Sequence, residues 1–242
     1  MAMFFHEDKY SNQSPTGFDK YRKILERDYK NFFLAGFITI LAFIPFAIGM
    51  FFSFACKSLL IMLLSSIFFG LFSGPALYGM YDIIFRSLRD LKIDWFYDYK
   101  KAIKNNWKES ILSGIILNLF IGAFAFIFML FWWTGVKPSA GTIFILCLSL
   151  IIVFMLLSVY FPQLVLFKQT NSIRFKNCIL FCIKYFWSTL RTALLKICYL
   201  FIIFLFMPWS IFLILTIGIW FILFLSNFLL YDNLKQAFNI KS

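Results

Sequence analysis

Between residues 32 and 56 the chain reads FFLAGFITILAFIPFAIGMFFSFAC, a long run without a single charged side chain. A transmembrane α-helix needs about 20 consecutive, mostly apolar residues, so this stretch predicts a membrane-spanning helix. Further apolar blocks follow at residues 58–81, 111–133, 142–167, 190–207 and 209–230. The pattern predicts an all-α, polytopic membrane fold with six transmembrane helices in three hairpins.

The composition supports lipid as the solvent for these blocks. Hydrophobic residues make up 62% of the chain and charged residues 14%, which is too little polar surface to coat a soluble globule of 242 residues. The net charge of +12 comes from short basic stretches that flank the apolar blocks. Such stretches are typical of contact with anionic lipid headgroups, so the bilayer is the expected partner and nucleic acid is not.

The distribution of basic residues predicts the topology. In a six-span arrangement, all of the 23 Lys and Arg except Lys57 and Lys137 fall on one side of the membrane. Because Lys and Arg are concentrated in short cytoplasmic loops, we expect a multi-pass protein of the cell membrane with both termini in the cytoplasm. The first 31 residues are polar and the first apolar block is long, so we expect no cleavable signal peptide.

The number of spans depends on the last apolar run. Residues 198–230 would form a helix of about 50 Å at 1.5 Å per residue, much longer than the hydrocarbon layer of about 30 Å. A break at Pro208 divides this run into two spans, with Lys196 snorkelling from the inner end of the fifth. The alternative is one long span, which gives five in total and places the C-terminus outside.

Weak internal similarity divides the chain further. Residues 1–17 form a polar tail, and 18–242 form one transmembrane helical domain. Within it, Phe18 to Gly36 aligns with Phe96 to Gly114 at an offset of 78 residues. We predict three repeats, at 18–95, 96–174 and 175–242, each a surface helix followed by a transmembrane hairpin.

Each predicted surface helix combines an aromatic and aliphatic stripe with basic side chains. In the second, Trp95, Tyr99, Ile103 and Trp107 recur every four residues, and the membrane-surface basic residues around them are Lys100, Lys101, Lys104 and Lys108. The third is expected to carry a stripe of Ile179, Ile183, Phe186 and Leu190.

Several short strings resemble the YesL-like family of small bacterial integral membrane proteins. They are GPALYGMY at residues 74–81, the aromatic and basic segment at 96–108, and YFP at 160–162. The resemblance implies a helical membrane protein associated with carbohydrate uptake. It implies no catalytic or ligand-binding residues, because none are established for the family.

Motifs for catalysis are absent from the sequence. It contains a single histidine, His6, and no metalloprotease, serine-hydrolase or nucleotide-binding pattern. We therefore predict a protein that is not an enzyme, without catalytic residues, metal ligands or a cofactor. One acidic series stands out: Asp90, Asp94 and Asp98 would form a carboxylate row if helical, able to hold a divalent cation or to pair with neighbouring Arg and Lys.

Polar groups inside the apolar blocks are few. Asn118, Gln163 and Asn227 are expected to form hydrogen bonds between helices, or alternatively to contact a ligand along a polar path. Pro75 and Pro162 are expected to kink their helices, or alternatively to break them into a cavity. These five residues are the candidates for a ligand path.

Two functions remain open from the sequence. The first is a non-catalytic, accessory component of a solute uptake system, such as one for carbohydrate, or of the cell envelope; its partner would be a membrane permease complex or a second copy of the chain. The alternative is a small-solute transporter or channel. The lack of charge within the apolar blocks favours the accessory role.

Overall fold

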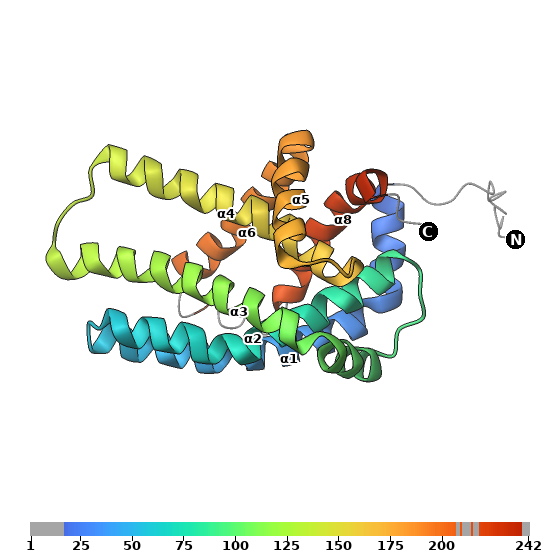
Figure 1. The fold of residues 1–242 in the computed structure, drawn as a ribbon, viewed down its shortest axis with the longest axis horizontal. Helices are drawn as coiled ribbons and strands as arrows, with labels where there is room; N and C mark the ends of the chain where they lie inside the picture. Colours follow the sequence, from blue (N-terminus) through green and yellow to red (C-terminus); the bar gives the residue numbers. More distant parts are fainter. Residues whose placement is uncertain (1–16, 207–208, 210–213, 215–217, 239–242) are drawn as a thin grey trace, which may run out of the picture.

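The computed structural model describes residues 17–206, 209, 214 and 218–238, and the regular secondary structure in these ranges is entirely α-helical (Figure 1). This confirms the all-α fold class. The helices are α1 (Gly17–Ala55), α2 (Leu59–Leu88), α3 (Trp95–Thr134), α4 (Ala140–Leu166), α5 (Asn171–Lys184), α6 (Phe186–Leu205) and α8 (Gly218–Phe238).

Five helices are long and apolar enough to cross a membrane: α1, α2, α3, α4 and, over Phe186–Ile203, α6. The sixth predicted span, at 209–230, lies partly outside the described residues. The predicted tail, apart from residue 17, and the predicted break at Pro208 lie outside them as well. The structure therefore supports a helical membrane protein, and the six spans remain a prediction.

Small residues allow α1, α2 and α3 to form a close-packed bundle. Gly70 and Gly74 are one turn apart on α2 and pack on the backbone of α3 at Ile115 and Gly114. Small residues spaced by four let helix backbones approach closely within membranes. On the other face of α2, Gly49 of α1 packs against Ser65.

The turns α1–α2 and α3–α4 lie at the same end of the elongated molecule, which we call the hairpin end (Figure 1). Ser58 caps α2 there, its Oγ accepting from the Ile61 N–H at 3.4 Å. Gly135 ends α3 with a φ of 65°, a left-handed conformation that glycine adopts without steric cost. The first turn of α1 and the end of α8 lie toward the opposite end (Figure 1).

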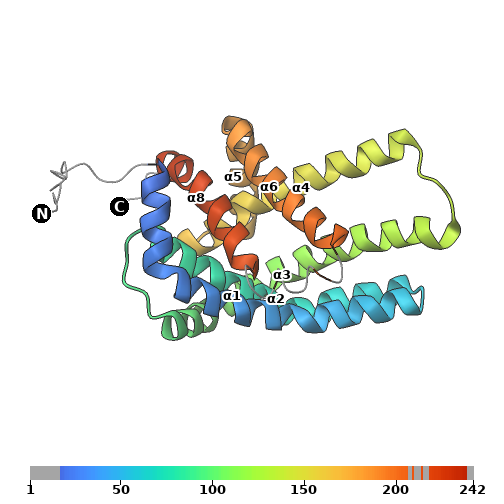
Figure 2. The same cartoon turned by 180° about the vertical axis from the view of Figure 1, so that it is seen from behind.

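The second half of the molecule packs less completely than the first. Helices α6 and α8 cross the back of the molecule, where α6 packs on α4 and α8 packs on both α6 and α1 (Figure 2). No residue of α4 between 140 and 154 is buried, whereas Met155 and six later residues are. Accordingly, α3 and α4 diverge toward the hairpin end (Figure 1).

The three basic segments are helical, as the sequence predicts, but they join their spans differently. The first continues without interruption into α1. In α3 the helix kinks at Asn106, whose φ of −130° is not helical. The third segment is a separate helix, α5, which ends at Lys184 with Tyr185 as its C-cap. The stripe predicted from Ile179 to Leu190 is therefore wrong as a single helical face, because its members belong to α5 and α6.

Candidate functional site

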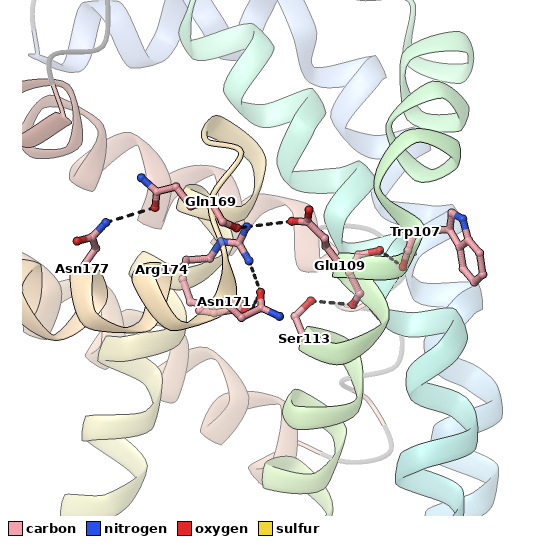
Figure 3. Close-up of polar contacts among 9 residues, drawn as sticks. Trp107, Glu109, Ser113, Gln169, Asn171, Arg174 and Asn177 are labelled. Atoms are coloured by element: carbon pink, nitrogen blue, oxygen red, sulfur yellow. Dashed lines mark hydrogen bonds and ion pairs between the residues drawn. The ribbon is translucent and has the colours of Figure 1, made fainter.

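The most unusual polar side chain in the described structure is Arg174, on the first turn of α5. It has no exposed surface, although arginine is almost never fully buried unless it is paired. Its Nη2 donates to Glu109 Oε2 at 3.0 Å and to the Gln169 carbonyl at 2.8 Å. Its Nη1 donates to Asn171 Oδ1 at 2.5 Å. These contacts form the Arg174 cluster shown in Figure 3.

Three helices and one loop supply the Arg174 cluster. Glu109 lies on α3 directly after the kink at Asn106, Gln169 lies in the loop after α4, and Asn171 begins α5. Helix α4 adds Tyr160, whose ring centroid is 5.6 Å from the guanidinium carbon of Arg174. A guanidinium over an aromatic face is a favourable cation–π arrangement. Arg174 thus joins segments that are far apart in the sequence.

The charge balance of the Arg174 cluster is uneven. The Arg174 side chain is fully buried, whereas the side chain of Glu109 is 48% exposed. The Nε of Arg174 is buried and has no hydrogen-bond partner among the described residues. Because an arginine carries five N–H donors, the cluster satisfies this cation incompletely.

An apolar crevice of about 210 Å³ lies beside the Arg174 cluster. It is lined by residues of α3, α4 and α5, namely Ser113, Ile116, Phe120, Val153, Leu156, Leu157, Tyr160, Phe175 and Cys178, and the atoms that face it are apolar. Tyr160 belongs to both the crevice and the cluster, and its hydroxyl lies 3.4 Å from Asn171 Oδ1. Charge and apolar surface therefore meet at one place.

The Cys178 thiol forms part of this wall and is not a reactive group. Burial raises its pKa to about 12, and burial likewise raises the pKa of Cys182 on the next turn to about 11. The thiolate is the nucleophilic form of cysteine, so at neutral pH both residues act as small apolar side chains.

Asp90, Asp94 and Asp98 do not form the row of carboxylates on one helix that the sequence analysis considered. Asp90 precedes α3 with a φ of 55°, and Asp94 caps the helix, accepting from the Tyr97 N–H at 3.3 Å. The three residues do not share one helix face because α3 begins only at Trp95, and Asp98 Oδ2 accepts from the Asp94 N–H at 3.0 Å. Ion pairing, the simpler interpretation, is confirmed: Asp98 lies 3.2 Å from Arg86.

Asp90 takes part in a separate contact between α1 and α2. Arg27 Nη1 donates to Asp90 Oδ1 at 2.7 Å, and Arg27 Nη2 donates to the Ser87 carbonyl at 2.9 Å. The Ser87 hydroxyl in turn donates to the buried Asp28 carboxylate. Each acidic residue here has a basic or hydroxyl partner, and in the described part of the chain no group of three or more His, Cys, Asp or Glu could hold a metal ion.

Asn118 lies buried between α3 and α2. Its Nδ2 donates to Ser73 Oγ at 3.0 Å, and its backbone carbonyl accepts from Ser66 at 3.4 Å. The prediction of an interhelical hydrogen bond is confirmed for this residue. Its Oδ1 is buried and finds no partner among the described residues.

The other two candidate amides, Gln163 and Asn227, lie on α4 and α8, away from Asn118 in the sequence. Gln163 is buried and donates to Cys178 Sγ at 3.4 Å, which links α4 to α5 beneath the crevice. Asn227 is buried on α8 and donates to the Leu223 carbonyl of its own helix at 2.7 Å. No hydrogen bond in the described ranges connects one of the three amides to another, and the ligand path stays a prediction.

The two prolines do not break their helices. Pro75 is buried inside α2 and Pro162 inside α4, and both helices continue past them. The alternative of a proline-lined cavity is therefore wrong for both. The predicted membrane-surface residues Lys100, Lys101, Lys104 and Lys108 are all exposed on α3, and their place at the membrane surface stays a prediction.

The prediction that Lys196 snorkels from the end of its span is wrong. Its side chain does not snorkel to an interface; it is 7% exposed and donates to Ser158 Oγ on α4 at 2.9 Å. Sequence reasoning did not single out the partners of Lys196 or the burial of Arg174, because each depends on contacts between distant helices. The spacing of Gly70 and Gly74 was a signal of close helix packing that could have been used.

Comparisons with models of known protein families, with characterised proteins and with solved structures found no match. The resemblance to the YesL-like family therefore stays a prediction.

Proposed function

We propose that this chain is a non-catalytic integral membrane protein that serves as an accessory component of a solute uptake or envelope system. One observation carries the proposal: the polar side chains of Asn118, Gln163 and Lys196, within the apolar stretches of the spans, are buried and bonded to neighbouring helices. Asn118 bonds to α2, Gln163 to α5 and Lys196 to α4. A transporter for a polar solute needs such groups on a pathway.

The crevices support the same proposal. Besides the crevice beside Arg174, an apolar groove runs between α1 and α2 and is lined by residues such as Ile48, Phe52, Leu64 and Phe68. Sites for a sugar contain polar groups placed to fix its hydroxyls. Surfaces of this apolar kind suit lipid chains or other membrane helices instead.

The proposal includes six spans in the cell membrane with both termini in the cytoplasm. The hairpin end carries Lys57 and Lys137, the two cations that the positive-inside arrangement leaves outside. A carbohydrate system is the proposed setting, on the strength of the family resemblance alone.

A pair of measurements separates the accessory role from transport. An affinity-tagged chain is extracted from its native membrane in mild detergent and is expected to co-purify with the subunits of a solute permease. The same chain alone in proteoliposomes is expected to show no uptake of radiolabelled hexose or disaccharide above that of empty vesicles.

Two matched variants sharpen the second measurement. If the chain is itself a transporter, it shows flux that Asn118→Leu abolishes, while Phe128→Leu, an exposed position of the same helix that does not line the crevice, leaves that flux intact. Such a result would overturn the accessory role. If instead no permease co-purifies and no flux is seen, the uptake setting is wrong.

A further inference from the structure

The crevice between α3, α4 and α5 has the dimensions and chemistry of a site for a hydrocarbon chain. Its 210 Å³ exceeds the roughly 150 Å³ of a protein cavity that binds benzene. It is smaller than the roughly 300–1,000 Å³ typical of sites for drug-sized ligands. Because its facing atoms are apolar, neither a sugar nor an ion would be stabilised inside it.

Polar groups are confined to one end of this crevice. Tyr160 lines the crevice and also contacts both Arg174 and Asn171. On α5, Phe175 and Cys178 face the crevice, and Arg174 lies beside Phe175 with its buried Nε lacking a partner among the described residues. An apolar slot with a polar end matches the layout of a membrane lipid.

The charge at this end selects among lipids. Three exposed lysines adjoin the Arg174 cluster in sequence: Lys108 precedes Glu109, Lys168 precedes Gln169, and Lys176 lies two residues after Arg174. The carboxylate of the cluster, Glu109, already accepts from Arg174 at 3.0 Å. The remaining positive charge favours an anionic headgroup.

We propose that this crevice binds one acyl chain of an anionic phospholipid, whose phosphate contacts Lys108, Lys168 and Lys176 beside the Arg174 cluster. The headgroup lies on the side of the membrane where these lysines lie, which is the cytoplasmic leaflet in the topology proposed above. The site requires that the chain be embedded in a bilayer, and it is independent of any permease partner.

Native mass spectrometry of the purified chain tests the site with defined lipids. The protein is titrated with phosphatidylglycerol or phosphatidylethanolamine of identical acyl chains. The wild type is expected to retain one phosphatidylglycerol preferentially. Val153→Phe fills the crevice and is expected to weaken this binding about tenfold, because the displaced methylenes lose their burial. Equal binding of the two lipids by the wild type would overturn the proposal.

Matched controls separate the site from general lipid association. Ile152→Phe adds the same ring to the neighbouring, exposed position of α4, which does not line the crevice, and it is expected to bind as the wild type does. Ile116→Phe, at the exposed edge of the crevice on α3, serves as a second filling variant. If both filling variants bind phosphatidylglycerol as tightly as Ile152→Phe, the proposal is wrong.

The headgroup is tested by charge. Lys108→Gln together with Lys176→Gln is expected to remove most of the preference for phosphatidylglycerol. Lys100→Gln together with Lys101→Gln makes the same change of charge on the exposed face of α3 away from the cluster and is expected to keep it. Equal effects of the two pairs would show that only the overall charge matters, which contradicts a defined headgroup site.

The identity of the occupant is tested in native membranes. A photo-cross-linking amino acid at Phe120, which lines the crevice and is 41% exposed, is expected to form an adduct of the mass of a phospholipid. A cross-link to a second copy of the chain or to another membrane protein would show that a helix fills the crevice, and would overturn the proposal.

Discussion

Gly74 of α2 and Gly114 of α3 meet backbone to backbone: a Cβ added to Gly74 would lie 2.9 Å from the Cα of Gly114. This contact closes the interface that also contains Asn118 and Ser73. In a membrane the hydrophobic effect does not drive helices together, so close packing of small residues and interhelical hydrogen bonds stabilise such an interface. The first three helices can therefore form a fixed bundle against which the second half of the chain packs.

Enlarging one of these glycines should separate the helices. Gly114→Ala places a methyl group against the backbone of α2 at Gly70 and Gly74, and it is expected to lower stability by about 1–3 kcal/mol, as overpacking does. The measurement is the thermal unfolding midpoint in detergent. Gly141→Ala in α4 is the control: its Cβ would meet only Ser139 Oγ at 3.8 Å, so the midpoint should stay equal or rise. Equal losses in both variants would contradict the contact.

Much of the fold could be predicted from the sequence because its main determinant is local. A run such as residues 32–56 is apolar over a length that only a helix can carry across lipid, and no knowledge of neighbours is needed. The surface segments follow from local spacing as well. The junctions between these segments and their spans do not follow from local spacing. The kink at Asn106 and the end of α5 before Tyr185 depend on how each segment packs against other helices.

The candidate site could not be predicted in the same way. In sequence, Arg174 and Lys176 are two cations of one basic helix, yet the first is fully buried and the second is exposed. The difference arises because α5 turns Arg174 toward Glu109, 65 residues away. Asn118 was predictable as an interhelical donor because an amide in an apolar block has few other options.

The Arg174–Glu109 pair should respond unequally to the loss of each partner. Glu109→Gln leaves the buried guanidinium without its counter-charge, and because Glu109 is half-exposed the expected cost lies below the roughly 3–5 kcal/mol of breaking a fully buried pair. Because the Glu109 side chain is 48% exposed, Arg174→Met leaves a carboxylate that water can solvate. Glu109→Gln is therefore expected to lower the unfolding midpoint more than Arg174→Met does.

The double variant provides the control for that asymmetry. In the Arg174→Met background, Glu109→Gln leaves no buried cation without a counter-charge and should cost little further stability. Thermal unfolding of the four proteins in one detergent gives the coupling between the two sites. Additive losses would show that the pair is not coupled and that the burial of Arg174 is supported by Gln169 and Asn171 instead.

Cysteine labelling checks both the packing of α5 and the topology. Cys178 and Cys182 are buried, and burial raises the pKa of both thiols, so neither should react with a maleimide while the protein is folded. Cys56, exposed at the hairpin end, should react. In intact cells a membrane-impermeant maleimide is expected to label a variant that retains only Cys56 and to leave a variant with only Cys178 and Cys182 unlabelled until detergent denaturation.

The same thiols predict a direction for the pH dependence of stability. A thiol whose pKa is raised by folding stays protonated in the native state, whereas in the unfolded chain it loses its proton above the ordinary thiol pKa of about 8.5. The unfolded state is then favoured as the pH rises beyond that value. Cys178→Ala with Cys182→Ala should reduce the loss of stability between pH 8 and pH 10; an unchanged pH profile would contradict burial of the thiols.

The buried charge of Lys196 is expected to lower the free energy of unfolding. Its ammonium carries three N–H donors, and the acceptor that the described structure provides is Ser158 Oγ at 2.9 Å, with no carboxylate in ion-pair range among these residues. A lysine deep in a membrane span costs about 2.5–3.5 kcal/mol. Lys196→Met keeps the length of the side chain without the charge and is expected to raise the unfolding midpoint in lipid nanodiscs.

Ser158→Ala distinguishes this explanation from a general effect of packing. In the wild type it removes the acceptor from a buried ammonium and should cost about 1–3 kcal/mol. In the Lys196→Met background the serine hydroxyl still donates to the Phe154 carbonyl at 2.7 Å but has no cation to satisfy, so the loss should be smaller. If Lys196→Met instead lowers the midpoint, the ammonium must be stabilised in the membrane by an anionic group from outside the described chain.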